Sequence, residues 1–275
     1  MKQIRQMMKS KTFVIGLLMV SSVIFIAIFA DTIAPYGYDE VNMDASLQAP
    51  GNQYFWGTDQ LGRDLFSRVI FGSRIALMVA LISVILETVI GVTVGLFSGF
   101  FGGKADKILS FLTDLTWAMP PIIMALAVIT IIGPGLNNVI AAISIVSWAQ
   151  FARVVRAKTQ ALKNLPFVEA GVAIGEKKII LVLRYILPNI VPSIIVIATI
   201  LIPGAIMSTT ALGFLGLGAQ PPSPDWGVAL SEGTAYIAEA PWLGIFPGIA
   251  LTYTVLGFNL LGEGLRDVLD PRLQL

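Results

Sequence analysis

Six apolar runs dominate this sequence, and each is long enough to cross a membrane as a helix. They cover residues 12–30, 75–101, 108–132, 136–152, 189–212 and 242–262. A helix needs about 20 mainly apolar residues to cross a bilayer, because the hydrocarbon layer is about 30 Å thick. Backbone polar groups must also be satisfied within each segment, which favours helices. The sequence therefore predicts an all-α, polytopic membrane protein with six transmembrane helices.

The composition supports one membrane-embedded domain and excludes several kinds of chemistry. Of the 275 residues, 56% are hydrophobic and 13% are charged, which leaves no room for a sizeable water-soluble domain. The chain has no cysteine and no histidine. Thiol nucleophiles, disulfides, thiolate metal sites and histidine-based proton shuttles are therefore excluded, and we expect no metal site.

The first apolar run shares one property with a secretory signal, because a basic leader precedes it. That leader contains Lys2, Arg5, Lys9 and Lys11. The run of 19 residues is longer than a usual signal core, however, and five more apolar runs follow it. We therefore expect an uncleaved first helix.

The charges between the runs indicate how the chain is oriented. With six spans, every basic residue except Arg63, Arg68 and Arg74 falls on the side that holds both termini. The opposite side keeps those three arginines together with nine carboxylates. Cytoplasmic loops of membrane proteins are enriched in lysine and arginine. The pattern predicts that both termini are cytoplasmic.

The second run carries small residues on one face, next to a carboxylate. Glu87, Gly91, Gly95 and Gly99 recur every four residues and so lie on one side of a helix. Small residues at this spacing let two helix backbones approach closely in a membrane. We expect this side to pack against another helix.

Two carboxylates lie inside the predicted spans. Glu87 is in the second run, and Asp114 is near the start of the third, where Pro120 and Pro121 predict a kink. An intramembrane carboxylate is costly and is often functional. A proton relay needs several titratable groups in reach, and the sequence indicates no intramembrane partner for either residue. We therefore favour a structural role for both.

The polar segment between the fourth and fifth runs contains the pattern of a short helix. Pro166 suits a first helical turn, Glu169 suits the positive end of the helix, and Gly175 suits its end. Two turns are not stable alone. Four apolar residues of this helix would be exposed unless it docked on something: Phe167, Val168, Val172 and Ile174.

We expect this helix to dock on a partner, with Gly171 and Gly175 allowing close backbone contact. The alternative is that the segment folds back on its own bundle. The basic residues that precede it, Arg153, Arg156, Lys158 and Lys163, are expected to attract anionic lipid headgroups.

At this point the residues resemble a known family. Part of the chain is similar to the EAA motif of ABC importer permeases, through Glu169, Ala170, Gly171, Gly175, Leu187 and Pro188. In that family the motif forms a coupling helix that fits a groove on a cytoplasmic ATPase. Gly171 stands where alanine is usual, and Tyr185 stands where isoleucine is common. The glycine is expected to weaken the helix by roughly 1 kcal/mol.

Three further stretches resemble the C-subunit branch of dipeptide, oligopeptide and nickel permeases. Residues 56–68 (WGTDQLGRDLFSR) resemble its signature before the second span, residues 214–227 its external loop after the fifth span, and residues 262–273 its ending. We expect salt bridges and hydrogen bonds to tie the external loops together. The candidate residues there are Arg63, Asp64, Asp225 and Trp226. Contact of these loops with a substrate-delivering protein is a hypothesis.

The resemblance implies a type I ABC importer permease fold. Residues 1–74 would hold the cytoplasmic N-terminus, the first helix and an external loop. Residues 75–275 would form a five-helix permease core, with a cytoplasmic coupling segment at about 153–188. The implied function is one half of a translocation pore for peptides or similar small solutes in the inner membrane. The implied partners are a second related permease, two cytoplasmic ATPases, an extracytoplasmic solute-binding protein and membrane lipid, with no nucleic acid.

The chain is not expected to be an enzyme. It has no GxxxxGK[ST] phosphate loop, so ATP and Mg²⁺ are expected on the partner ATPases, and no cofactor is expected on this chain. Two alternative functions belong to other classes of membrane protein. A secondary transporter would show an internal repeat with coupling-ion groups near the midplane, and no such repeat is evident. A membrane scaffold would lack ATPase coupling. The transported solute stays open among dipeptides, oligopeptides, glutathione, metal chelates and haem.

Overall fold

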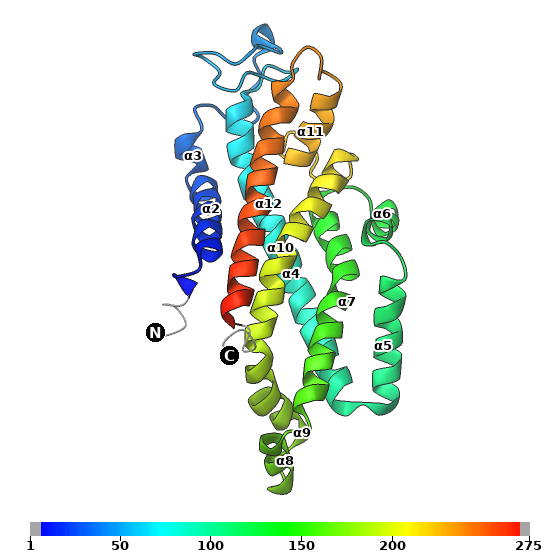
Figure 1. Ribbon diagram of the computed structural model, residues 1–275. Helices are drawn as coiled ribbons and strands as arrows, with labels where there is room; N and C mark the ends of the chain where they lie inside the picture. Colours follow the sequence, from blue (N-terminus) through cyan, green and yellow to red (C-terminus); the bar gives the residue numbers. More distant parts are fainter. Residues whose placement is uncertain (1–6, 270–275) are drawn as a thin grey trace.

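The computed structural model describes residues 7–269, and within that range every regular element is a helix (Figure 1). The elements, in chain order, are α2 (Lys11–Ile28), α3 (Ala30–Ile33), η1 (Met43–Ala45), α4 (Leu65–Phe101), α5 (Gly103–Trp117), α6 (Pro121–Ile132), α7 (Leu136–Leu162), α8 (Pro166–Ala173), α9 (Lys178–Ile180), η2 (Leu181–Ile186, a π-helix), α10 (Leu187–Phe214), α11 (Trp226–Thr234) and α12 (Trp242–Leu269). Lys2 and Arg5 of the basic leader and residues 270–273 of the expected ending lie outside the described residues.

The membrane spans agree with the predicted all-α polytopic fold. Five helices of the described chain are long and apolar enough to cross a membrane, and a bent pair, α5 with α6, makes a sixth candidate span. The two helices of this pair meet at 92°, so the expected kink is a break in the span. Its cause is local, because a residue that precedes proline disfavours the helical conformation. Pro120 is accordingly extended, with ψ of 129°, and Pro121 starts the next helix.

Several helices run past the ends of the apolar runs. α4 begins at Leu65, ten residues before the predicted span, so the expected division between residues 74 and 75 falls inside a helix. α7 continues to Leu162, whereas the fourth run ends at residue 152. An apolar run marks the part of a helix inside hydrocarbon, and capping residues mark where the helix stops. Asp64 caps α4 by accepting a hydrogen bond from the Ser67 backbone N–H.

The helices form an elongated bundle whose two ends differ (Figure 1). α4, α7, α10 and α12 make its centre, α2 lies along α12, and α5 stands beside α7. α8 and α9 lie at one end of the bundle, while α11 and the chain between α3 and α4 lie at the other.

The glycines of α4 lie against α7. A Cβ atom added at Gly91, Gly95 or Gly99 would lie 2.6, 2.7 or 2.7 Å from a backbone carbonyl oxygen of α7. Such distances are far inside van der Waals contact, so only glycine permits this approach. Glu87, one turn earlier on the same side, is 1% exposed. The two helices therefore meet backbone to backbone along three turns.

A second close contact joins α2 to α12. A Cβ atom at Gly16 would lie 2.3 Å from the Leu261 backbone nitrogen, and one at Gly264 would lie 2.6 Å from the Phe13 Cα atom. The sequence analysis did not identify this contact. Its glycines are spread over two helices that are far apart in the chain, so no single run displays them as a stripe.

Replacing Gly95 with alanine should lower the melting temperature of the purified protein in detergent. The added methyl group overpacks the α4–α7 contact, which costs about 1–3 kcal/mol. The matched control is Gly204→Ala in α10, where an added Cβ atom would have nothing within 4 Å. That variant should melt at the same temperature as the parent or slightly higher, since alanine favours helix. Equal melting temperatures for the two variants would show that the α4–α7 contact is not tight.

Candidate functional sites at the two ends of the bundle

The short helix α8 forms where the sequence predicted it, and its ends follow the expected chemistry. Pro166 and the acidic residue Glu169 both lie in the first turn. At the other end Gly175 has a φ of +81°, a left-handed conformation that glycine adopts without strain. The Gly175 N–H donates to the Val172 carbonyl at 3.0 Å, and the Glu176 N–H donates to the Gly171 carbonyl at 3.1 Å. These bonds close the helix.

One side of α8 packs on its own bundle, which corrects part of the sequence-based expectation. Val168 is 1% exposed and belongs to one apolar cluster with residues of α4, α7, η2 and α10: Leu96, Val155, Val182, Ile186 and Ile190. The helix itself contacts mainly η2. Gly171 is also buried, and a Cβ atom there would lie 2.6 Å from Leu181 Cδ2. Val168 and Gly171 therefore face their own chain, as in the fold-back alternative, and the role of Gly171 in ATPase coupling stays a prediction. They seat the helix on its own chain.

The opposite side of α8 is exposed and apolar. Phe167 is 39% exposed, Val172 59% and Ile174 74%. Glu169, Ala170 and Gly175 are exposed beside them. The described chain thus leaves open an apolar surface, defined here as the outer face of α8, at the tip of the bundle.

The remaining two motif residues lie apart from α8, at the start of α10. Leu187 is half-buried in the cluster that holds Val168, and Pro188 is exposed in the first turn of α10. Between them and α8 lies the π-helix η2, whose Tyr185 approaches Gly171. The motif therefore spans a helix, a turn and the base of a membrane span.

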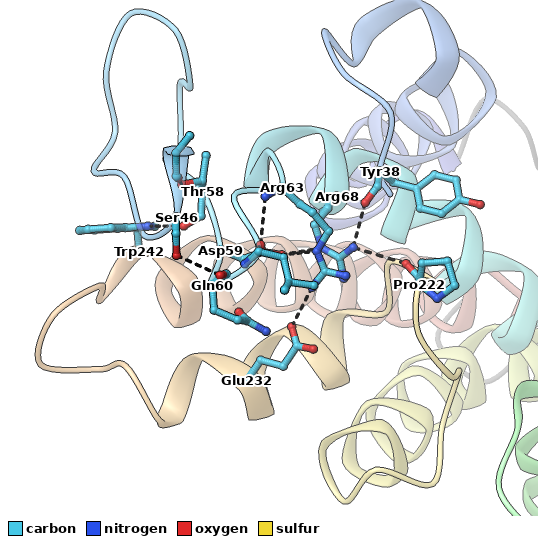
Figure 2. A network of polar contacts seen from close by, with 12 residues as sticks. Tyr38, Ser46, Thr58, Asp59, Gln60, Arg63, Arg68, Pro222, Glu232 and Trp242 are labelled. Atoms are coloured by element: carbon cyan, nitrogen blue, oxygen red, sulfur yellow. Dashed lines mark hydrogen bonds and ion pairs between the residues drawn. The ribbon is translucent and has the colours of Figure 1, made fainter. Parts of the chain in front are cut away.

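A buried network of charges organises the loop between α3 and α4 at the other end of the bundle (Figure 2). The Arg63 guanidinium donates to Asp59 at 2.6 Å and reaches Glu232 of α11 at 3.5 Å. Arg68 also lies 3.5 Å from Asp59, and it donates to the backbone carbonyls of Tyr38 at 2.9 Å and Pro222 at 3.4 Å. Arg63 and Asp59 are each 3% exposed. These two arginines join three segments that are distant in the sequence.

Asp64 and Asp225 act as helix caps. Asp64 accepts hydrogen bonds from the Ser67 N–H and hydroxyl, and Asp225 accepts from the N–H groups of Gly227 and Val228 at 2.7 and 3.1 Å. Burial raises the pKa of both carboxyls, and these hydrogen bonds oppose the rise by stabilising the charged forms.

Trp226 follows the second cap and anchors α11 to α4. Its indole N–H donates to the Val69 carbonyl at 3.0 Å, and the side chain is 4% exposed. All four candidate residues of the external loops are thus nearly fully buried. They stabilise the loops from the inside and are not part of the exposed surface.

Sequence reasoning missed several polar contacts because their partners lie on different helices. Arg153 donates to Asp114 at 3.0 Å, which corrects the expectation that Asp114 has no partner. Arg74 donates to Asp31 at 2.7 Å, and this bond lowers the pKa of the Asp31 carboxyl. Glu87 lies buried in the bundle, and its Oε1 atom has no hydrogen-bond partner among the described residues. Hydropathy along one helix carries no signal for any of these pairings.

The comparison with known families gives the chain its class. The family described as binding-protein-dependent transport system inner membrane component matches residues 91–275, which is most of the chain. The chain belongs to this family. A second family, the N-terminal TM domain of oligopeptide transport permease C, matches residues 2–50. The protein is therefore a multi-pass permease subunit of an ATP-binding-cassette importer, and not the subunit that hydrolyses ATP.

Two similar proteins cover almost the whole permease. The dipeptide transport system permease protein DppC of Alkalihalophilus pseudofirmus is 42% identical over 98% of this chain and 89% of its own length. The glutathione transport system permease protein GsiD of Shigella flexneri is 46% identical over 94% of this chain and 85% of its own length.

A solved structure shares the fold of the permease. It is the MetNI methionine ABC transporter in an inward-facing conformation, with a TM-score of 0.59 and 21% identity over 73% of this chain and 96% of the other. The predicted type I importer permease fold is confirmed by this likeness.

Arg63→Gln should loosen the external loop. Removing the guanidinium leaves the buried Asp59 carboxylate with fewer partners, which costs roughly 2 kcal/mol. Hydrogen exchange of the loop peptides in the purified protein should become faster. Asp44→Asn is the matched control, since it removes an exposed carboxylate from the same loop. Unchanged exchange in Arg63→Gln would mean that the buried network does not hold the loop.

Proposed function

We propose that this permease forms half of the translocation pore of an importer for peptides or similar small solutes, and that α8 couples it to a separate ATPase. The observation that carries the proposal is the seating of α8. Val168 places the helix in an apolar cluster that includes residues of three membrane spans, while its outer face stays apolar and open. An exposed apolar surface of this kind in a cytoplasmic segment marks a docking site.

The seating of α8 explains how force would reach the pore. The cluster around Val168 includes Leu96 of α4, Val155 of α7 and Ile190 of α10. Close-packed side chains transmit displacement with little compression. A movement of α8 by a docked ATPase would therefore move the ends of three spans together. Rigid-body movement of this kind would open the pore alternately to the two sides of the membrane.

The charge distribution supports the proposed orientation, with α8 and both termini on the cytoplasmic side. In the described chain, the segment from the end of α7 through α9 and η2 carries several cations near α8: Lys158, Lys163, Lys177, Lys178 and Arg184. The opposite end carries most of the carboxylates, among them Asp39, Glu40, Asp44 and Glu239. This asymmetry is the positive-inside pattern.

The proposed partners follow from the exposed surfaces and the family. Two ATPases would contact the outer face of α8 and that of a second, related permease, whose membrane-embedded face completes the pore. A solute-binding protein would contact the external end, where Met43 is 62% exposed, Phe55 59% and Ile237 68%. Arg63 and Asp225 would support that contact from beneath, since both are buried.

The proposed cargo rests on the similar proteins. Their names specify dipeptide and glutathione transport. Both solutes are short peptides, which is the basis for the proposed substrate class.

Val172→Asp should abolish ATPase binding without unfolding the permease. The side chain is exposed, so the change leaves the bundle intact, but a charge placed in an apolar contact should weaken docking more than about tenfold. Co-purification of the ATPase subunits and uptake of a labelled dipeptide both measure the effect. Ile237→Asp makes the same chemical change on an exposed residue at the far end and should retain the ATPase. Normal ATPase recovery with Val172→Asp would exclude α8 as the docking helix.

A further inference from the structure

A polar cavity of about 250 Å³ lies between α4, α5 and α7, away from both candidate sites. Its polar lining comes from all three helices: Ser98, Ser110, Thr113, Asp114, Arg153 and Arg156. The cavity is open on one side and its lining mixes polar with apolar groups, so it suits a ligand that has both kinds of surface.

The cavity lies near the end of the spans that carries α8. Ser98 is one turn before α4 ends at Phe101, and Ser110 is in the second turn of α5. Arg153 stacks over the Trp117 ring with 4.6 Å between the guanidinium carbon and the ring centroid. By the orientation proposed above, the cavity lies toward the cytoplasmic ends of α4 and α5, where lipid headgroups would be within reach.

The two arginines of the cavity differ in how far they are satisfied. Arg156 donates two hydrogen bonds to Asp106, at 2.6 and 2.7 Å. Arg153 donates one to Asp114 at 3.0 Å, and its side chain is 50% exposed. A guanidinium carries five N–H donors. Within the described chain, Arg153 therefore has donors left for a ligand in the cavity.

The charge around the cavity is positive. Lys104 and Lys107 are exposed in the first two turns of α5, just before Ser110 of the same helix, which lines the cavity. Together with Arg153 and Arg156 they outnumber the two carboxylates, Asp106 and Asp114. Basic pockets between spans on the cytoplasmic side suit anionic headgroups. On the outer side of α5, Phe111 and Leu115 are 65% and 55% exposed, beside the path that acyl chains would follow.

We propose that this cavity binds the phosphate headgroup of an anionic phospholipid, with Arg153 as its main ligand and Lys104 and Lys107 at its rim. The lipid would fill the space between α5 and α7. Those helices are otherwise tied mainly by two ion pairs, since α5 buries only Thr113 and Thr116. Lipid composition would then set how firmly the bent span is held to the bundle.

The test is native mass spectrometry of the complete importer in nanodiscs that contain phosphatidylglycerol and phosphatidylcholine. The parent should retain phosphatidylglycerol in preference to phosphatidylcholine. Arg153→Gln should lower that retention about fivefold, the effect of one cation near an anionic surface. Arg266→Gln is the matched control, because it makes the same change at an exposed arginine of α12 that does not line the cavity. It should retain the lipid as the parent does.

A third variant separates a binding site from a structural ion pair. Asp114→Asn frees the Arg153 guanidinium and removes a negative charge, so it should raise phosphatidylglycerol retention. If the pair only held the helices together, Asp114→Asn and Arg153→Gln would both lower retention. Should Arg153→Gln lower the melting temperature, Arg153→Lys replaces it and should keep retention close to that of the parent.

Two results would overturn the proposal. One is an equal loss with Arg153→Gln and Arg266→Gln, which would indicate general surface attraction. The other is full displacement of the lipid by soluble glycerol phosphate at the same concentration, which would indicate a site for free phosphoesters.

Discussion

The backbone contact between α4 and α7 is the constraint on which the rest of this structure depends. Three glycines allow α4 to lie against the carbonyl oxygens of α7. In a membrane there is little hydrophobic force between helices, so close packing supplies much of the association. Leu96 of α4 and Val155 of α7 belong to the same apolar cluster as Val168 of α8. The packing of α4 on α7 therefore helps to position α8. The position of the outer face of α8 therefore depends on the close contact between α4 and α7 that these glycines permit.

The two ends of the bundle are built on opposite principles. The external end is held by buried ion pairs and by two aspartate caps, so its loop has a fixed shape. The α8 end is held by apolar contacts on one side and leaves the other side open. A rigid loop surface suits the recognition of a folded partner protein. An exposed apolar helix face suits the docking of an ATPase. In the bent span, α5 is tied to α7 by the ion pairs of Arg153 and Arg156, whereas α6 packs on α7 through apolar residues such as Ala125 and Ile129.

Much of this arrangement could be predicted from the sequence, and the failures share one cause. Apolar runs gave the spans, Pro120 and Pro121 gave the position of the break, and the pattern from Pro166 to Gly175 gave α8. Each of these signals is local to one helix. The sequence could not show which side of α8 faces its own bundle, so it could not place Val168 and Gly171 on that side.

Other failures also concern pairings between helices. Gly16 meets α12, and Asp114 meets Arg153, 39 residues away along the chain. Local periodicity fixes the face of a helix but not the partner that the face meets. Only the packed bundle supplies that information.

The central claim is that α8 and the external loop lie on opposite sides of the membrane, with α8 on the ATPase side. The natural chain has no cysteine, so single cysteines can be placed at Ile174 and at Ile237, which are 74% and 68% exposed. An impermeant maleimide added to cells whose inner membrane is intact should label Ile237→Cys and leave Ile174→Cys unlabelled until that membrane is permeabilised. Labelling of Ile174→Cys in intact cells, with Ile237→Cys protected, would contradict the account.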